Sequence, residues 1–214
     1  VRAIIGADPR TGGEVLLNGK PLNCRTPHDA IANGVVMVPE DRKLQGIIPR
    51  MSVGKNISIG SLDQITNRLG IVNTRREEQI GLDGKANFNI KTPNLEKPIV
   101  ELSGGNQQKA IVARWMSTKP EVLILDEPTK GIDVGAKSEF YNMICEFAKE
   151  GLAVILISSE LPEVIGLSDR IIVMRGRRIV GEISAKDATE EKLLSMAMIC
   201  LLYTSPSPRD RSVS

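Results

Sequence analysis

The amino-acid sequence predicts an α/β protein built on a mainly parallel sheet with helices on both faces. Short apolar runs at Val35–Val38, Val122–Leu125 and Ala153–Ile157 have the length and composition of fully buried strands. Helical patterns separate these runs, as expected for parallel strands joined by crossover helices. The composition, 41% hydrophobic and 25% charged over 214 residues, is that of a globular chain with a core large enough to fold.

The first part of the chain predicts a helix end, a hairpin and a short helix. Val1–Ala7 is expected to end a helix, because Gly6 and the Asp-Pro pair after Ala7 are typical helix-stopping residues. Glu14–Leu17 and Lys20–Leu22 flank an Asn-Gly turn, which predicts an antiparallel hairpin. A short helix is expected over His28–Ala32 after the Thr-Pro pair.

Residues 44–100 have a different character and predict a small helical subdomain inserted between strands. They are rich in Gly, Asn, Lys and Arg, with short amphipathic pieces at Ser52–Leu62 and Thr74–Leu82. Beyond this insertion, regular patterns predict helices over Asn106–Thr118, Gly135–Lys149, Leu161–Leu167 and Thr189–Ala197, and strands over Arg170–Met174 and Arg178–Glu182.

The bulk properties exclude several classes of protein. A net charge of +2 and an aromatic content of 3% argue against nucleic-acid binding. Cys24, Cys145 and Cys200 show neither disulfide nor zinc-site spacing, so we expect reduced thiols. The one histidine, His28, is expected on the surface, and no apolar run approaches the ~18 residues of a membrane-spanning helix.

Two adjacent carboxylates, Asp126 and Glu127, follow the apolar run Val122–Leu125. Ligands of parallel sheets bind beyond the carboxyl ends of the strands, so this position predicts a ligand site. Asp126 is placed to hold Mg²⁺, and Glu127 to polarise a water for attack on a phosphoryl group. The alternative interpretation is a strand that ends in two solvated acids.

A second candidate site is formed by Ser103, Gly104 and Gly105 at the start of a predicted helix. Two glycines leave backbone N–H groups open at the positive end of the helix dipole, which favours an anion. The alternative interpretation is an ordinary helix cap. The chain between Ser103 and Asp126 has room for one helix and one buried strand, so the two motifs are expected in one fold.

These motifs resemble those of a known family. The run LSGGNQQK followed by VLILDEPTKGID resembles the signature helix, the Walker B strand and the D-loop of ABC ATPases. With VPEDRK and ISSELPEV, it resembles the second ATP-binding half of the tandem subunits that energise monosaccharide importers of the ribose, galactose, xylose and arabinose type. The resemblance covers residues 1–198 and implies an ABC-type P-loop NTPase core with the helical insertion.

The resemblance also implies roles for individual residues. Signature residues are expected to contact the γ-phosphate of ATP bound to the opposing half: Ser103, Gly104, Gly105 and Gln107. Asp126 and Glu127 are expected to bind the metal and to polarise the water at the chain's own nucleotide site, the cis site, with ATP and Mg²⁺ as cofactors. Asp133 falls on the D-loop at the dimer interface, where its alternative role is a helix cap.

The chain departs from the family pattern at three points. The phosphate-binding loop G-x-x-x-x-G-K-[ST] does not occur in the sequence, and we expect it upstream of Val1 in a longer protein. Glu40 stands at the glutamine position of the Q-loop, where a carboxylate can reach Mg²⁺ or pair with a neighbouring base instead. Ser159 stands at the position of the switch histidine. These departures predict a catalytically poor cis site.

The resemblance implies a peripheral subunit at the cytoplasmic face of the bacterial membrane. The expected partners are a first ATPase half or a second copy, membrane permease subunits bound through residues 44–100, and indirectly a periplasmic sugar-binding protein. Met51–Val53 and Ile57–Ile59 are candidate permease contacts or local core. Residues 199–214 are predicted to be a non-native disordered tail. The alternatives are a soluble ABC ATPase acting on ribosomes or DNA, and a fragment that is inactive as written.

Overall fold

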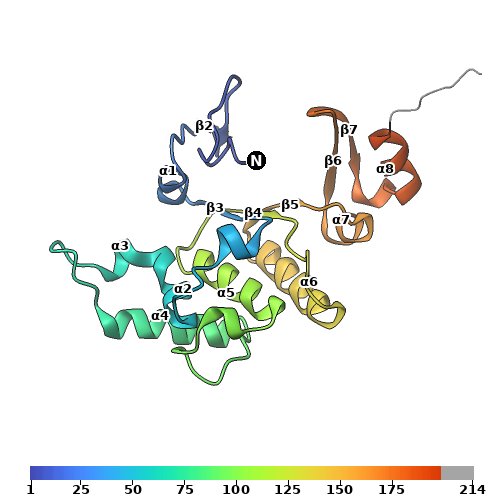
Figure 1. Cartoon of the computed structure of the whole chain (residues 1–214). Coiled ribbons are helices and arrows are strands. Elements are labelled where there is room, and N and C mark those ends of the chain that lie inside the picture. Colours follow the sequence, from blue (N-terminus) through green and yellow to red (C-terminus); the bar gives the residue numbers. More distant parts are fainter. Residues whose placement is uncertain (199–214) are drawn as a thin grey trace, which may run out of the picture. The chain divides into compact units, whose positions relative to one another are not determined.

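The computed structural model describes residues 1–198, which form two compact units. The first unit is Val1–Ser159, and the second begins at Glu160. Figure 1 shows the order of the elements along the chain. The predicted tail, residues 199–214, lies outside the described residues.

The first unit contains the predicted parallel sheet. Its strands are β3 (Val35–Val38), β4 (Val122–Asp126) and β5 (Ala153–Ile157), with β4 in the centre and both pairings parallel. All three predicted strands are confirmed, with β4 one residue longer. Because the strands are parallel, their carboxyl ends meet at the same edge of the sheet.

Helices α5 (Gly104–Met116) and α6 (Val134–Lys149) run beneath one face of this sheet (Figure 1). Strand residues alternate between the two faces of the sheet. On the face covered by these helices the strand residues are fully buried, each at most 1% exposed: Val36, Val38, Leu123 and Leu125. Burial of four such side chains stabilises the unit by several kcal/mol, at about 1.5–3 kcal/mol each.

The N-terminal segment covers the other face of β3 and β4. Leu22 and Ala30 form a buried cluster with Val35 and Ile124 of the sheet. The segment contains the predicted hairpin, β1 (Leu16–Leu17) and β2 (Lys20–Pro21), and helix α1 (Pro27–Ala32). The mainly parallel α/β class with helices around the sheet and an antiparallel hairpin is confirmed.

Val1–Ala7, predicted to end a helix, form a series of turns that close in the manner of a helix C-terminus. The Ala7 N–H donates to Arg2 O at 3.0 Å, and Gly6 has a φ of +72°. A Cβ at Gly6 would lie 2.7 Å from Thr26 N. The 6→1 hydrogen bond and the left-handed Gly6 are those of a helix C-cap, and the chain before α1 packs closely against this glycine.

The insertion is helical, as predicted, and packs against α5. Its main helices are α2 (Val53–Ser58), α3 (Leu62–Ile65) and α4 (Thr74–Asn87), joined by a 3-10 turn at Ile59–Ser61. A π-helical turn at Arg42–Gly46 precedes them, and a 3-10 turn at Ile99–Glu101 follows.

A buried arginine holds this insertion to α5. Arg114 donates through Nε to Asn56 O at 2.6 Å and through Nη1 to Gly46 O at 2.7 Å. Burial lowers the pKa of Arg114 to about 10. Val53 and Ile57 are 0% exposed, so they belong to the local core, the second of their two predicted roles.

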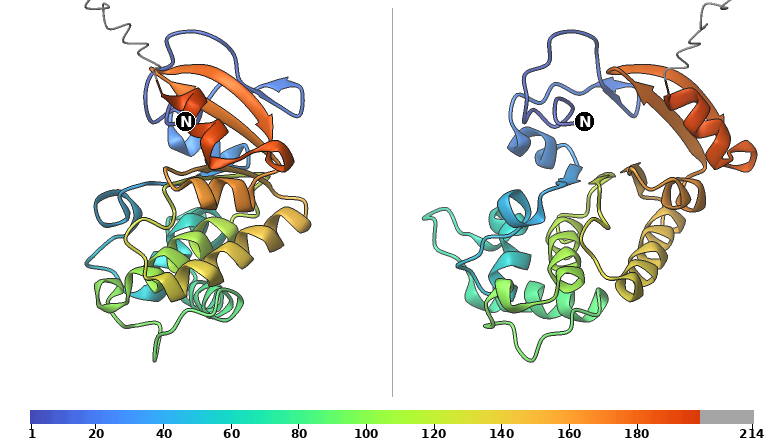
Figure 2. Two further views of the ribbon diagram at one scale, coloured as in Figure 1. Left: turned by 90° about the vertical axis from the view of Figure 1, so that its right-hand side faces the viewer. Right: turned by 45° about the vertical axis from the view of Figure 1, so that its right-hand side comes forward.

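The second unit is a hairpin with two short helices, seen in orange and red in Figure 2. It consists of α7 (Leu161–Leu167), β6 (Arg170–Arg175), β7 (Arg178–Ser184), a 3-10 turn at Ala185–Asp187 and α8 (Glu190–Ala197). Ile171, Val173 and Leu193 form its core. Thr189 caps α8 by accepting from Lys192 N at 3.3 Å.

Candidate functional site

The carboxyl ends of the three parallel strands bring the predicted cis-site residues to one edge of the sheet. Asp126 ends β4, Glu40 follows β3, and Ser159 follows β5. The register pairs Asp126 with Ile157, which places Ser159 beside the segment that carries Glu127. Residues far apart in the sequence therefore meet here, as the strand pattern predicted.

Asp126 and Glu127 lie in different environments although they are adjacent. Burial raises the pKa of Asp126, and the negative charges of Glu40 and Glu127 raise it further. Glu127 has a φ of +45°, and its N–H donates to Ile157 O at 2.8 Å. Its carboxylate accepts from Ser159 Oγ at 3.2 Å. The serine at the expected histidine position thus contacts the candidate base directly.

Glu40 is an exposed acid whose carboxylate is already paired. Lys130 Nζ lies 2.6 Å from Glu40 Oε1, and this hydrogen bond raises the pKa of Lys130. The predicted alternative partners were the neighbouring bases, but the observed partner comes from the segment after β4. Lys130 was missed because the contact joins distant parts of the chain.

The signature residues Ser103–Gly105 begin α5, with Gly104 half-buried and Gly105 buried. Ser103 is exposed and caps the helix, accepting from Asn106 N at 3.5 Å and from Asn106 Nδ2 at 2.9 Å. Any side chain at Gly104 would meet Arg42 Nη2 at 2.9 Å and Gly131 O at 3.0 Å, and one at Gly105 would meet Ala136 Cβ at 2.9 Å. The glycines therefore let the signature segment pack tightly on the segment after β4.

Gln107 lies in the interior of the unit, with 6% of its surface exposed. Its Nε2 donates to Leu102 O at 3.1 Å and to Ile99 O at 3.3 Å, and its Oε1 accepts from Arg42 Nε at 3.2 Å. These bonds occupy both ends of the amide. In this arrangement Gln107 supports the loop before Ser103 from inside and does not face outward beside it.

Arg42 is a site residue that the sequence motifs did not single out. It is half-buried, and burial lowers its pKa. Besides Gln107 Oε1, its guanidinium donates to Lys130 O at 3.4 Å, and Nη2 lies beside Gly104. Arg42 therefore connects the segment after β3, the signature helix and the segment after β4.

Asp133 is exposed and caps α6, accepting from Ala136 N at 2.9 Å. The sequence left two roles open for Asp133, a helix cap and a D-loop residue at a dimer interface. The observed cap is the first of these, and it is compatible with the second.

The carboxylates at the sheet edge fit a magnesium ion only in part. Across residues 1–198, no three His, Cys, Asp or Glu side chains gather closely enough to hold a metal by themselves. Asp126 has the donor chemistry for Mg²⁺, and the neighbouring carboxylates that raise its pKa would favour a cation. Phosphate oxygens would have to supply most other ligands, because Glu40 is bound to Lys130.

Comparison with known proteins agrees with this geometry. The family model described as ABC transporter matches residues 1–130. This chain belongs to the ABC transporter family. The predicted resemblance and fold are thereby confirmed.

Over the aligned residues, curated relatives within the ABC transporter family are about 50% identical to this chain. It is 51% identical over 199 residues to the arabinose import ATP-binding protein AraG of Mannheimia succiniciproducens, covering 93% of this chain and 40% of the relative. The corresponding protein of Pectobacterium atrosepticum is 50% identical, with 93% and 39% covered. The chain thus spans about 40% of the length of these relatives.

Solved structures of ABC proteins share the fold. A dimeric post-hydrolysis state of the ATP-binding cassette MJ0796, bound to ADP and Pi, superposes with a TM-score of 0.70 at 17% identity, covering 86% of this chain and 78% of the other. The cbiO1 protein of Clostridium perfringens, part of the transporter complex cbiONQ, gives 0.71 at 23% identity, covering 90% and 74%.

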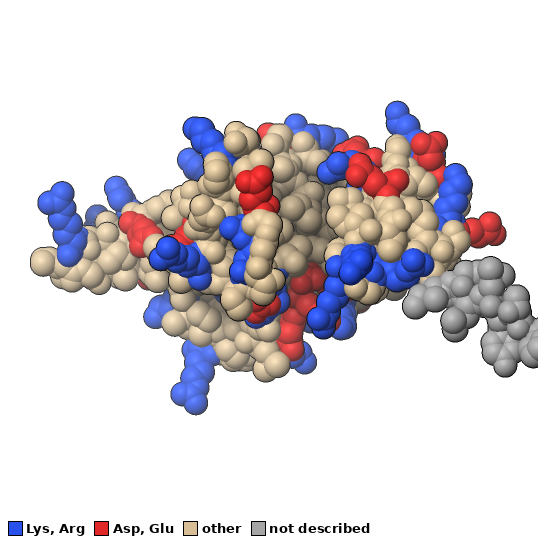
Figure 3. All heavy atoms as spheres, turned by 90° about the horizontal axis from the view of Figure 1, so that it is seen from above, with Lys and Arg blue, Asp and Glu red and all other residues tan. Residues whose placement is uncertain are grey.

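The surface of the chain offers no large area of one charge on the face in Figure 3, where basic and acidic side chains are interspersed. Among the described helices of this ABC transporter chain, none has both the length and the apolar character that a membrane crossing needs.

Proposed function

We propose that this chain is part of an ATP-hydrolysing subunit that energises monosaccharide import, and that it lends its signature segment to a partner ATP site. The observation that carries this proposal is an asymmetry. Ser103 is exposed, and its hydroxyl contacts Asn106 of its own helix. Glu40 and Glu127, at the chain's own strand edge, are instead held by side chains from other segments.

The signature segment supplies the chemistry of an anion-contacting surface in trans. Ser103 brings an exposed hydroxyl to the N-terminus of α5, where backbone N–H groups favour an anion. The helix dipole adds positive potential at this end. A γ-phosphate of ATP held by an opposing half is the proposed ligand. In this view Gln107 and Arg42 support the segment from behind.

The chain's own nucleotide site is proposed to be a poor catalyst. Asp126 is the residue that would hold Mg²⁺, whose role is to neutralise charge on the phosphates. Glu127 is the candidate base, but its neighbour Ser159 is a hydroxyl with no acid–base pKa near neutrality. Glu40 would have to leave Lys130 before it could reach a metal or a water. We therefore expect this site to bind and retain nucleotide but to hydrolyse it inefficiently.

The proposed partners follow from this role. A first ATPase half of the same subunit, or a second copy, would supply the opposing phosphate loop, and Asp133 would lie on the D-loop at that interface. The insertion, residues 44–100, is proposed to face the permease, at the cytoplasmic side of the membrane. The sugar-binding protein would act indirectly. The relatives named as arabinose import proteins make a pentose the first monosaccharide to test.

The test of this function is genetic complementation. Bacterial cells that lack their arabinose-import ATPase, but keep the permease and binding protein, would receive the complete reading frame that contains this chain. We expect restored uptake of radiolabelled arabinose, lost on Ser103→Arg. Normal protein levels without uptake of arabinose, ribose, galactose or xylose would contradict the proposal.

A soluble ABC ATPase acting on ribosomes or DNA is the competing function, because the family resemblance alone allows it. Co-purification separates the two. The proposed subunit should purify from detergent extracts with its permease, and recovery with ribosomes or DNA at moderate salt would favour the competitor.

A further inference from the structure

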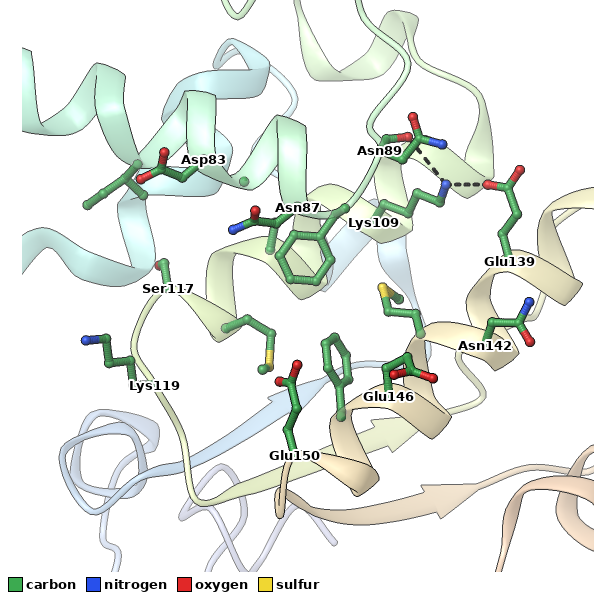
Figure 4. A pocket seen from close by; sticks show the side chains of 17 residues that line it. Asp83, Asn87, Asn89, Lys109, Ser117, Lys119, Glu139, Asn142, Glu146 and Glu150 are labelled. Carbon is green, nitrogen blue, oxygen red and sulfur yellow. Dashed lines mark hydrogen bonds and ion pairs between the residues drawn. The ribbon is translucent and has the colours of Figure 1, made fainter.

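Arg42 is a half-buried cation without a carboxylate partner. Lys109, a buried cation on α5, shows the usual arrangement, because its ammonium pairs with the Glu139 carboxylate at 2.5 Å (Figure 4). Arg42 forms no such ion pair within residues 1–198, although burial lowers its pKa and so disfavours its charge. A partly desolvated positive charge is costly unless an anion lies beside it. The position of Arg42 therefore favours an anionic ligand.

The guanidinium of Arg42 also keeps hydrogen-bond donors free. Nε donates to Gln107 Oε1 at 3.2 Å and Nη1 to Lys130 O at 3.4 Å, but Nη2 has no acceptor in the described part of the chain. Arg114 also lacks a carboxylate, yet all three of its nitrogens are bonded to oxygens. Arginine N–H groups match the oxygens of phosphate or carboxylate. Nη2 of Arg42 is thus available to such a ligand.

The acidic side chains around Arg42 are bound elsewhere. Glu40 pairs with Lys130 at 2.6 Å. Asp41 attracts Arg42, but its Oδ1 accepts from two backbone N–H groups of the π-helical turn, each at 3.0 Å. Asp133, in the segment after β4, caps α6. None of these carboxylates forms a hydrogen bond to the Arg42 guanidinium, so its charge is only partly offset from within the chain.

The free nitrogen lies between the signature segment and the segment after β4. Nη2 is 2.9 Å from the position that a Cβ at Gly104 would take, and 3.8 Å from the corresponding position at Gly131. Gly131 is exposed, and nothing else lies within 4 Å of its Cβ position. Ser103, the neighbour of Gly104, is exposed as well. The space beside Gly131 is therefore open toward Nη2.

We propose that Arg42 contacts the same phosphate as the signature segment, an inference that rests on the proposed function. The ligand is the terminal phosphate of a nucleoside triphosphate held by the opposing half. Ser103 would offer its hydroxyl, and Arg42 would offer Nη2 while Nε and Nη1 go on supporting the segment. A guanidinium adds a full positive charge where the helix N-terminus supplies only a partial one. Arg42 would thus favour a triphosphate over a diphosphate.

The test is equilibrium binding of fluorescent nucleotides to the intact subunit, purified with its permease. The probes are methylanthraniloyl (mant) derivatives of AMP-PNP, a non-hydrolysable triphosphate, and of ADP, which lacks the terminal phosphate. Arg42→Gln should weaken mant-AMP-PNP binding at one site about tenfold, because a charge-assisted hydrogen bond is lost, and mant-ADP binding less than about twofold. Equal weakening of both probes would show that Arg42 acts only through the fold and would overturn the proposal.

Two further variants separate the charge of Arg42 from its packing. Arg42→Lys keeps a positive charge and should bind mant-AMP-PNP within about threefold of the unmodified subunit. A loss as large as that of Arg42→Gln would mean that the charge is not what the phosphate requires. Arg25→Gln removes an exposed arginine outside the site and is the matched control. An effect of Arg25→Gln equal to that of Arg42→Gln would reduce the result to net charge and contradict the contact. Thermal unfolding curves verify that every variant is folded.

Ser103→Ala distinguishes a failure of this inference from a failure of the proposed function. Weaker mant-AMP-PNP binding in both Ser103→Ala and Arg42→Gln, with mant-ADP unaffected, supports a shared phosphate contact. An effect of Ser103→Ala alone would leave the signature segment in its role and overturn only the assignment of Arg42. An effect of neither variant would overturn the role in the partner site itself, and the Arg42 contact with it.

Discussion

Asp126 and Arg42 are charged residues that the site holds in partly buried positions, at a cost in folding stability. Asp126 keeps a carboxylate at a partly buried strand end, close to Glu40 and Glu127. Arg42 keeps a guanidinium half-buried against neutral oxygens. Both groups have shifted pKa values because burial disfavours their charged forms. Such shifts cluster at functional sites, although structural groups also show them.

Asp126→Asn should stabilise the chain at neutral pH. The folded-state pKa of Asp126 is raised, so the protonated carboxyl stabilises the fold at low pH, and this contribution is lost as pH rises through the folded pKa. Asparagine carries no charge and avoids that loss. We therefore expect the free energy of unfolding at pH 7 to rise by about 0.5 kcal/mol, a figure that takes the partial exposure of the side chain into account. Urea unfolding at several pH values should show the advantage near pH 7 and its disappearance in acid.

The control for this prediction is Asp63→Asn, since the Asp63 side chain is 93% exposed and no comparable effect is expected there. A destabilising effect of Asp126→Asn at pH 7 would contradict the electrostatic assignment.

Arg42→Lys should destabilise the chain by about 1 kcal/mol, because a lysine ammonium cannot reproduce the fork that reaches Gln107 and Lys130 O. Urea unfolding measures the loss. The exposed Arg50→Lys is the matched control and should have no measurable effect. Equal stabilities of the two variants would mean that the Arg42 contacts contribute nothing.

At the scale of elements, the sequence predicted strands better than irregular segments. Strands Val35–Val38 and Ala153–Ile157 match residue for residue, because apolar runs bounded by turn residues are local signals, and helix Leu161–Leu167 also matches. Helix α5 begins two residues earlier than expected, because Ser103 caps it and the glycines lie inside it. Val1–Ala7 forms turns without regular helical structure, but the closing glycine at Gly6 is where the sequence predicted it.

Gly105→Ala should push α5 away from α6. The added methyl would lie 2.9 Å from Ala136 Cβ, closer than carbon atoms pack, so we expect a cost of about 1–3 kcal/mol. Differential scanning calorimetry would show a lower midpoint. Gly12→Ala is the control, since nothing lies within 4 Å of the position that its added methyl would take. Similar midpoints for the two variants would contradict the tight packing.

The Lys109–Glu139 pair should respond unequally to loss of either member. The Lys109 side chain is 7% exposed and that of Glu139 is 45% exposed. Glu139→Gln leaves a buried ammonium without its carboxylate, whereas Lys109→Met leaves a partly hydrated acid near Lys91. We therefore expect Glu139→Gln to be the more destabilising by about 1 kcal/mol in urea unfolding. The reverse order would mean that Lys109 is solvated in solution.

At the scale of the whole molecule, the motifs predicted which segments would meet, but not all of their contacts. The strand pattern alone indicated that Asp126 and Glu127 lie at a ligand-binding edge. It could not reveal Lys130 or Arg42, because their contacts join residues 90 and 88 positions apart. The inward position of Gln107 was also hidden, since an amide beside a glycine pair fits a buried support and a ligand contact equally well.

In the proposed function, this chain completes a partner's ATP site and contributes little hydrolysis of its own. The most direct measurement is steady-state ATP hydrolysis by the intact subunit, assembled with its permease, in two single variants. Ser103→Ala should reduce the rate by about tenfold or more, because a hydroxyl at the reacting phosphate is lost. Glu127→Gln should leave most of the rate, because the cis site contributes little. Equal losses in the two variants would contradict the claim.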